Sequence, residues 1–185
     1  QNNYMVNWCT HDGALSDIEV EHEEVNGKFY HMIYKFADGS GEVQVATTRP
    51  ETYFGDTAIM VHPDDERYKS IVGKEVLLPL TERKIKVITD SHVDMEFGTG
   101  AMTITPWHSG IDFEIAKKHN LDMVQVIDEN GKLMDIAGEL KGLRAITEGR
   151  KRTVEILESK GLLVKKDEKY SHNIPVCYKC ETPIE

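Results

Sequence analysis

Residues 28–47 read KFYHMIYKFADGSGEVQVAT, and this stretch decides the fold that we predict for the chain. Residues 28–36 are rich in aromatic and β-branched side chains, which are enriched in strands. Residues 37–41 carry the glycine, aspartate and serine of a turn. Residues 42–47 alternate polar and apolar side chains with the period of a half-buried strand. The sequence therefore predicts an antiparallel hairpin.

Segments on both sides of this hairpin continue the β-rich pattern. We predict further strands over residues 4–8, 17–25, 58–61, 75–78, 84–88, 100–105, 124–127, 162–165 and 170–176. We also predict helices over residues 63–72, 110–119 and 145–160, the second capped by Ser109 and the third stopped by Gly161. The sum is an α+β fold with a largely β core and flanking helices.

The bulk composition limits the classes of function. The chain has 185 residues, a net charge of −10 and a pI near 5.3, which argues against a protein that binds nucleic acid without regard to sequence. Three small basic clusters are compatible with local contact to an RNA end, although a solvated surface is the plainer interpretation of each. These clusters are Arg83, Lys84 and Lys86; Lys117 and Lys118; and Arg150, Lys151 and Arg152.

Other features indicate the compartment and the extent of the protein. No apolar run approaches the roughly 18 residues of a membrane helix, and no secretory signal opens the chain. Three cysteines with one Cys-x-x-Cys do not form a secreted disulfide framework, so we expect a reduced, cytoplasmic setting. Because the chain begins without Met, we expect a fragment of a longer protein.

The first polar motif comes directly after the predicted hairpin. Thr47, Thr48 and Arg49 precede Pro50, which fixes its own φ and holds Arg49 extended. The hydroxyls suit an ester carbonyl, a ribose or a water, and the guanidinium suits a phosphate or carboxylate. The alternative is a threonine-rich strand end before a turn.

The second motif lies far along the chain. Gly98, Thr99 and Gly100 form a glycine loop that allows close approach of a ligand to the backbone, although a plain tight turn explains the same residues. His108 and Asp112 follow, with Asp112 in the first turn of a predicted helix. Its carboxylate is suited to an α-amino group, or simply complements the helix dipole, and His108 suits a turn residue bonded to backbone.

The third motif is a half-site for a metal. Cys177 and Cys180 have zinc-ligand spacing, Cys9 is a third thiolate candidate, and His11 or Asp12 could complete four ligands. The alternative is a metal-free knuckle with reduced thiols.

Taken in order, these stretches resemble one family. They look like the editing insertion of the class I aminoacyl-tRNA synthetases for valine, isoleucine and leucine, and most closely that of the valyl enzymes. Neither signature of ATP activation occurs, so we expect no aminoacylation from this chain alone. The resemblance is carried by residues 6–9, 14–21, 46–52, 55–58, 61–63, 65–68, 97–101, 112–114, 172–173 and 177–180.

The resemblance implies a barrel-like editing domain over residues 17–170. Residues 1–16 and 171–185 would form a base that links it to a catalytic body. The implied activity is post-transfer editing, the hydrolysis of mischarged Thr-tRNA(Val), with no cofactor for the reaction and a candidate structural zinc at the base. The implied partners are the 3′ end of tRNA(Val) and the rest of the synthetase, without a membrane.

The resemblance also implies roles for individual residues. Asp112 would hold the ammonium group of the wrong amino acid, with Thr47 and Thr48 as further catalytic residues. Thr105 would recognise its side chain, and the remaining pocket would come from Arg49, Gly98, Thr99, Gly100, Thr103, His108 and Ser109. Thr103 and Ser109 replace a lysine and an aspartate that are usual in valyl enzymes, and Trp107 replaces a small residue.

Two alternatives stand beside this prediction. The chain could edit for an isoleucyl or leucyl enzyme, or it could be a non-catalytic module that holds the acceptor end of a tRNA. Thr103 and Ser109 are the best support for a decayed pocket.

Overall fold

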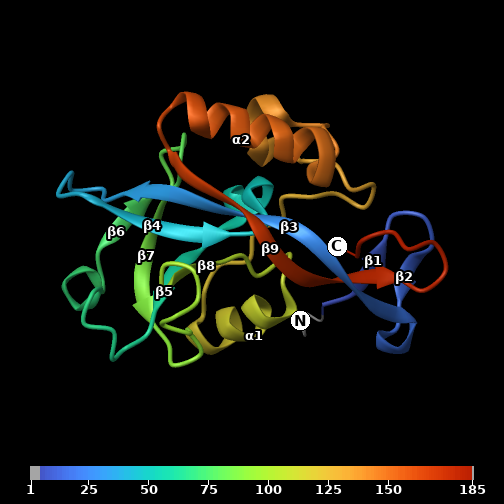
Figure 1. Ribbon diagram of the computed structural model, residues 1–185, viewed down its shortest axis with the longest axis horizontal. Helices are drawn as coiled ribbons and strands as arrows, with labels where there is room; N and C mark the ends of the chain where they lie inside the picture. Colours follow the sequence, from blue (N-terminus) through green and yellow to red (C-terminus); the bar gives the residue numbers. More distant parts are fainter. Residues whose placement is uncertain (1–4, 185) are drawn as a thin grey trace.

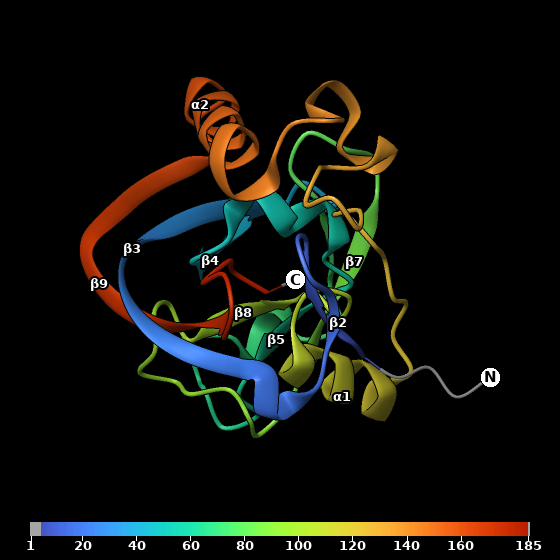
Figure 2. The ribbon, with the colours of Figure 1, turned by 90° about the vertical axis from the view of Figure 1, so that its right-hand side faces the viewer.

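The computed structural model describes residues 5–184, except for the side chains of residues 26, 165–166 and 168–170. Its largest element is a long, curved antiparallel ribbon made by β3 and β9, with β4 on the other edge of β3 (Figure 1). The side view shows β3 and β9 following each other along their length (Figure 2). The bounds are Val20–Lys35 for β3, Glu42–Thr47 for β4 and Leu163–Cys177 for β9.

A second sheet has the order β6-β7-β5-β8. β5 and β7 are parallel, whereas the β5–β8 and β6–β7 pairs are antiparallel. The bounds are Ala58–Val61 for β5, Glu75–Leu77 for β6, Lys84–Thr89 for β7 and Ala101–Ile104 for β8.

The two sheets meet at both of their edges, as in a barrel. Phe36, just after β3, forms a bridge with Val76 of β6. On the other side the Thr99 hydroxyl donates to the Gln44 carbonyl of β4 at 2.8 Å, just before β8 begins. This β-rich arrangement with few helices confirms the predicted α+β class.

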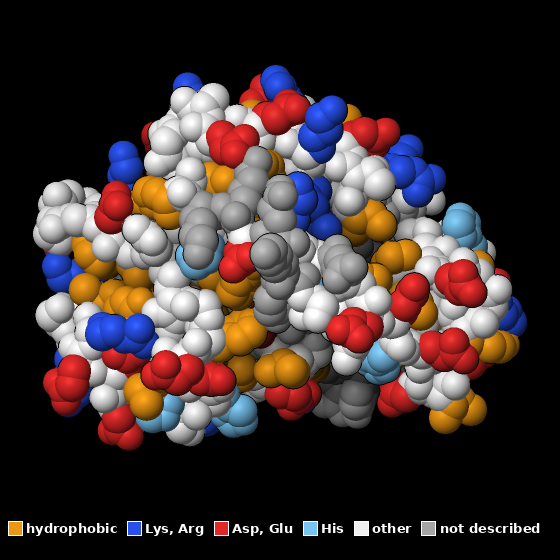
Figure 3. Space-filling view, viewed as in Figure 1, with side chains coloured by type: hydrophobic (Ala, Val, Ile, Leu, Met, Phe, Trp, Pro, Cys, Tyr) orange, Lys and Arg blue, Asp and Glu red, His pale blue; other side chains and the backbone are white. Residues whose placement is uncertain are grey.

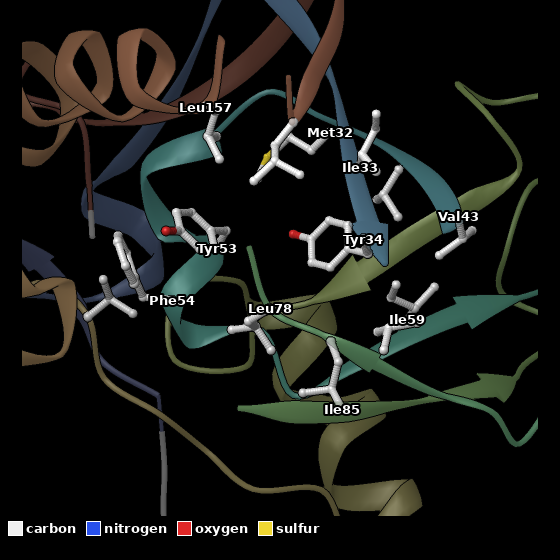
Figure 4. Close-up of a cluster of buried hydrophobic side chains, with 14 of the residues drawn as sticks. Met32, Ile33, Tyr34, Val43, Tyr53, Phe54, Ile59, Leu78, Ile85 and Leu157 are labelled. Atoms are coloured by element: carbon white, nitrogen blue, oxygen red, sulfur yellow. The ribbon is translucent and has the colours of Figure 1, made fainter. Parts of the chain in front are cut away.

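The main core fills the space between the sheets (Figure 4). β3 contributes Met32 and Tyr34, β5 contributes Ile59 and Val61, and all four are at most 1% exposed. Because strand side chains alternate, Ala58 and Met60 face the other side of β5, where they form a second cluster with Ile104 and Ile115. The second sheet is thus covered on both faces.

Two α-helices cover opposite sides of the molecule (Figure 1). Helix α1 (Gly110–His119) begins at Ser109, whose hydroxyl accepts from the Asp112 amide as predicted, and buries Ile115 under β5 and β8. Helix α2 (Arg150–Ser159) places Leu157 in the main core. A π-helix, Ala145–Gly149, leads into it, and 3-10 turns cover Asp17–Glu19, Pro50–Gly55, Lys69–Ile71 and Asp135–Leu140.

The small hairpin of β1 (Asn7–Cys9) and β2 (Gly13–Leu15) lies beside the C-terminal end of the chain (Figures 1 and 2). Cys9, Leu15, Cys177 and Ile184 pack together there as a third buried cluster. Among residues 5–184, no helix combines the length and apolar character required to span a bilayer.

Two predicted elements are wrong. Instead of a helix over residues 63–72 there is one 3-10 turn near the end of the range, because Asp65 accepts the Arg67 amide and its guanidinium, which competes with helical bonding. Instead of a strand over residues 124–127 there is a single bridge at Ile127, because the Val126 amide donates to the His108 ring rather than to another strand.

Other boundaries shift without changing the fold. The predicted strands 17–25 and 28–36 belong mostly to the single strand β3, and those at 162–165 and 170–176 to β9. The predicted helix 145–160 divides into the π-helix and α2. Residue 4, where the first predicted strand begins, lies outside the described residues.

Candidate functional site

Asp112 is held at the start of α1 by a hydrogen bond from the Thr105 backbone to one of its carboxylate oxygens. The residue is 8% exposed, and its Oδ2 accepts the Thr105 amide at 2.9 Å. Ser109 is the other hydrogen-bonding group beside this carboxyl group, and Oδ1 is not among the buried, unpartnered atoms of residues 5–184. Burial raises the pKa of Asp112 to about 6, against the opposing bonds from Thr105 and Ser109. Above that pH the site presents an anionic oxygen to a ligand.

Thr105 connects Asp112 to a second buried acid. Its hydroxyl donates to Asp56 Oδ1 at 2.7 Å, and the Tyr34 hydroxyl donates to Asp56 Oδ2 at 2.6 Å. Asp56 is 1% exposed, and burial raises its pKa to about 7, although the bonds from Tyr34 and Thr105 lower it. The two carboxyl groups therefore titrate in neighbouring ranges and repel each other when both are ionised.

The turn after β4 reaches this region through Arg49. The Arg49 amide donates to the Thr47 hydroxyl oxygen at 3.1 Å, which fixes the bend, and its Nη1 donates to the His108 carbonyl at 3.4 Å. Arg49 Nε also lies 3.6 Å from Glu51, a fully buried carboxylate. The predicted threonine turn and the predicted His108–Asp112 segment are thus brought together across nearly sixty residues of sequence.

His108 has a structural role here, consistent with the plainer interpretation of its sequence. Its Nε2 accepts the Val126 amide at 3.0 Å. Burial, assisted by the charge of Arg49, lowers the pKa of His108 to about 3. The ring is therefore neutral at physiological pH, and it lies before the helix rather than on the helical face of Asp112.

Several hydroxyl groups near these residues are open to a ligand. The side chains of Thr48 and Thr103 are half-buried and have no partner within residues 5–184. Thr103 lies on β8, two residues before Thr105, which directly follows the strand. Ser109 caps α1, with its oxygen 3.3 Å from the Asp112 amide.

The glycine loop is less close to Asp112 than the sequence prediction required. Gly98 has φ +60°, and a Cβ added there would lie 2.9 Å from the Ala46 Cβ, so the loop packs tightly against β4. The Gly100 amide already donates to the Phe97 carbonyl. Strand β8 separates this loop from Thr105, a path of roughly 13 Å for four residues. The loop and Asp112 lie at opposite ends of β8.

The three basic clusters are largely engaged within the molecule. Arg150 forms two bonds to Glu51, of 2.7 and 2.8 Å, and Lys118 donates to the buried Asp90 at 2.7 Å. Arg83 donates to the carbonyls of Phe54 and Asp56. Acidic and basic side chains are interspersed over the face drawn in Figure 3, which fits the interpretation of a solvated surface.

The three cysteines meet at the base, and the fourth candidate ligand is Asp12. The ligand atoms of Cys9, Asp12, Cys177 and Cys180 all lie within 4.8 Å of one another, with Cys9 Sγ and Cys180 Sγ 3.5 Å apart. Hydrogen bonds, first from Cys177, lower the pKa of Asp12, and the bond to Thr182 lowers that of Cys180 to about 7. His11 instead bonds the Thr182 hydroxyl.

Comparisons with known proteins identify the family of the chain. Residues 69–166, more than half of the chain, match the model of the family described as leucyl-tRNA synthetase, editing domain. The chain belongs to this editing-domain family. Individual sequence relatives indicate a narrower group of synthetases.

Sequence relatives of the chain are valine–tRNA ligases. It is 52% identical to the enzyme of Campylobacter jejuni (strain RM1221) over 183 residues, which is 99% of the chain and 21% of that protein. It is 49% identical to the enzyme of Helicobacter hepaticus over the whole chain and 20% of that protein. The chain thus spans about a fifth of the length of these relatives.

A solved structure of a LeuRS contains a part with a similar fold. The LeuRS of Agrobacterium radiobacter K84, crystallised as a ternary complex with tRNA and LeuAMS, superposes with a TM-score of 0.60 at 17% identity. The match covers 89% of this chain and 24% of that one. It supports the barrel-like fold of the editing domain.

Two residues of this site were not singled out by sequence reasoning. Asp56 was noted only as part of the resemblance, and Glu51 only as a neighbour of Pro50. Both are buried acids at or beside a short 3-10 turn, Pro50–Gly55, and their partners Tyr34 and Arg150 are distant in the sequence. Neither acid lies in an apolar run of the sequence, so no local pattern indicated that it would be buried.

Proposed function

We propose that this chain hydrolyses the ester that joins a wrongly attached amino acid to the 3′ end of tRNA(Val), with threonine as the amino acid removed. It does so as the editing part of a valyl-tRNA synthetase in the cytoplasm. The observation that carries the proposal is Asp112, whose Oδ2 is fixed by the Thr105 amide while Oδ1 stays accessible. Membership of the editing-domain family supports it.

The need for such a site is physical. Valine and threonine have nearly the same shape, and the apolar synthetic pocket of a valyl enzyme rejects threonine by only about a hundredfold, a value established for valyl enzymes in general. A second pocket can require the hydroxyl group of threonine, because valine would leave buried polar groups unpaired there.

The mechanism assigns each group a separate task. Asp112 binds the ammonium group through Oδ1, and Thr105 meets the side chain of the amino acid. The hydroxyls of Thr47, Thr48 and Thr103 orient the ester and an attacking water, with Ser109 at the rim. No covalent enzyme intermediate is required, because catalysis comes from positioning and from hydrogen bonds to the developing oxyanion.

The remaining predicted residues contact the tRNA rather than the amino acid. The loop of Gly98, Thr99 and Gly100 lies along β4, away from Asp112, so we assign it to the terminal nucleotide. Arg49 and His108 hold the turn between these two places. Residues 1–16 and 171–185 form the base that joins this editing domain, residues 17–170, to the rest of the synthetase.

A paired deacylation assay tests this function. The full-length synthetase is expected to hydrolyse Thr-tRNA(Val) at least a hundredfold faster than Val-tRNA(Val), because threonine alone satisfies the polar pocket. Equal and slow hydrolysis of both would support a non-catalytic module that holds the acceptor end. Faster hydrolysis of tRNA(Ile) or tRNA(Leu) esters would assign the chain to one of those enzymes.

We also propose a structural zinc ion at the base. Three thiolates and one carboxylate fit a tetrahedral zinc site, since Zn–S bonds of about 2.3 Å place sulfurs roughly 3.8 Å apart. The Cys9–Cys180 and Cys177–Asp12 distances of 3.5 and 3.3 Å need only small adjustments. The ion would clamp the β1–β2 hairpin onto the end of β9 and would take no part in hydrolysis.

Elemental analysis and chelation test the zinc site. We expect one zinc per chain, and its removal should lower the melting temperature by several degrees, because the base has only a small apolar cluster of its own. Cys180→Ser should lose the metal, whereas His11→Ala should keep it. A metal-free protein with a Cys9–Cys180 disulfide would contradict the proposal.

A further inference from the structure

Tyr34 and Asp56 form a buried chain of hydrogen bonds that ends on Thr105. Tyr34 lies in the main core beside Met32 and Ile33, and it is 1% exposed (Figure 4). Its hydroxyl is 2.6 Å from Asp56 Oδ2, and the Thr105 hydroxyl is 2.7 Å from Asp56 Oδ1. Each oxygen of this carboxyl group therefore faces one hydroxyl group.

The direction of these bonds follows from the chemistry of the three groups. Burial raises the pKa of Tyr34 well above its usual value, so the phenol keeps its proton and donates it to Asp56. Above about pH 7, where Asp56 is ionised, its carboxylate has no proton and only accepts hydrogen bonds. The single proton of the Thr105 hydroxyl is therefore directed at Oδ1 of Asp56, and Thr105 offers a ligand only the lone pairs of its oxygen.

We propose that Asp56 is a specificity-determining positioning residue, which acts through Thr105 to make the side-chain pocket a hydrogen-bond acceptor. Such a pocket favours amino acids whose side chain can donate a hydroxyl proton. This inference rests on the proposed function, in which Thr105 meets the amino-acid side chain. It adds the requirement that the substrate be a donor, and it names the group that imposes this requirement.

The requirement for a side chain that donates a hydrogen bond strongly favours threonine over valine. The hydroxyl of threonine donates to Thr105 Oγ1, whereas a methyl group in its place leaves that oxygen unpaired in a site where Thr105 is 8% exposed. An unpaired buried acceptor costs roughly tenfold to a hundredfold in binding. No donor from residues 5–184 bonds the Thr105 oxygen, so its lone pairs remain available.

Tyr34 and Arg83 keep Asp56 in place. The Tyr34 bond holds Oδ2, so the carboxylate can turn only Oδ1 toward Thr105. Arg83 Nη2 lies 3.3 Å from the Asp56 carbonyl, and its positive charge favours the ionised carboxyl group. The positioning residue is thus itself fixed from two sides, without any contact between these residues and the ligand.

The first test uses the unaltered synthetase and tRNA(Val) acylated by a ribozyme with different amino acids. O-methylthreonine and isoleucine have nearly the same shape, but the ether oxygen of the former can only accept. An acceptor pocket should therefore hydrolyse these two esters at rates within about threefold of each other, and both far more slowly than the threonine ester. Hydrolysis of the O-methylthreonine ester tenfold faster than the isoleucine ester would show that Thr105 donates, which overturns the proposal.

The second test measures discrimination in variants at about pH 8, where both carboxyl groups are ionised. Asp56→Asn turns an amide toward Thr105 or Tyr34, so we expect the ratio of kcat/KM for the threonine and valine esters to fall about tenfold to a hundredfold. Asp90→Asn is the matched control, because Asp90 is an equally buried, multiply bonded carboxylate beside the other end of α1. In Asp90→Asn the ratio of kcat/KM for the threonine and valine esters should not change.

A merely structural role for Asp56 would reduce both rates together and leave the ratio intact, which would contradict the inference. Action through Thr105 also predicts that Asp56→Asn produces no further change in the ratio on a Thr105→Val background. A further change of the ratio in the double variant would overturn the inference.

If the unaltered enzyme fails to hydrolyse the threonine ester at all, the proposed function fails and this inference with it. If it hydrolyses that ester but Asp56→Asn leaves the ratio of kcat/KM for the threonine and valine esters unchanged, only the inference fails.

Discussion

Replacing Asp112 will abolish the hydrolysis of Thr-tRNA(Val) by the synthetase that carries this chain, while aminoacylation continues. Its Oδ1 is the accessible anionic oxygen that we assign to the substrate ammonium group. Losing one partner of a largely desolvated charge pair costs about 2–5 kcal/mol, or roughly thirtyfold to several thousandfold in kcat/KM. The measurement is the rate of release of threonine from preformed Thr-tRNA(Val).

Asp112→Asn is the most informative variant. The amide oxygen can still accept from the Thr105 amide, which preserves the start of α1, but the charge is gone. Glu114→Gln is the matched control, since Glu114 lies on the same helix, is 69% exposed at its side chain and, among the described residues, is bonded to Lys117. Activity retained in Asp112→Asn would remove the proposed role of this residue.

The pH profile gives a second readout of the same role. Because burial raises the pKa of Asp112 to about 6, kcat/KM should fall at least tenfold per unit as the pH drops below 6, and it should be level only above pH 7, where Asp56 is ionised as well. Asp56 titrates near pH 7 and is close by, so the apparent values belong to the pair. In Asp112→Asn the pH profile of kcat/KM should lose the lower of its two steps. An unchanged profile would argue against the assignment of Asp112 to the substrate ammonium group.

The sequence predicts those parts of this fold that depend on local patterns. Strand β4 has the predicted bounds because its side chains alternate without interruption between the turn and Thr47. Strand β5 has them because a short apolar run can be buried on both faces. Helix α1 begins where Ser109 can cap it. In each case the residues that decide the structure are neighbours.

The failures occur where a side chain takes over a backbone group. Residues 124–127 look like a strand, but the Val126 amide is satisfied by the His108 ring, which lies outside the segment. Local propensity contains no information about such a partner. The helix expected at Pro63 is lost to local competition, because Asp65 binds the amide and guanidinium of Arg67, which in turn reaches the Met95 carbonyl.

The candidate site divides in the same way. Residue types pointed to Thr47 and Asp112, and the resemblance added Thr105. Bonds from Arg49 to His108 and from Thr105 to Asp112 link their segments. The resemblance also implied a pocket that includes the glycine loop, but strand β8 lies between this loop and Thr105. Asp56 was not singled out, because its partners Tyr34 and Thr105 are distant in the sequence.

Glu51→Ala will destabilise the chain more than any change on the surface. Glu51 is fully buried, with Arg150 bonded at 2.7 and 2.8 Å and Arg49 at 3.6 Å, so its loss leaves two guanidinium groups close together without an anion. We expect the free energy of unfolding to fall by about 3 kcal/mol. This is the lower end for a broken buried pair, because both arginines reach solvent. For a chain of this size the melting temperature should fall by roughly 6–12 °C.

Glu155→Ala is the control for this prediction, because its ion pair with Arg152 is exposed and should contribute under about 0.5 kcal/mol. A double replacement, Glu51→Leu with Arg150→Met, should recover part of the loss, since an apolar pair avoids the cost of desolvating charge. Urea denaturation measures all four proteins. If Glu51→Ala unfolds at the same urea concentration as the unaltered chain, Glu51 does not tie the turn after β4 to α2.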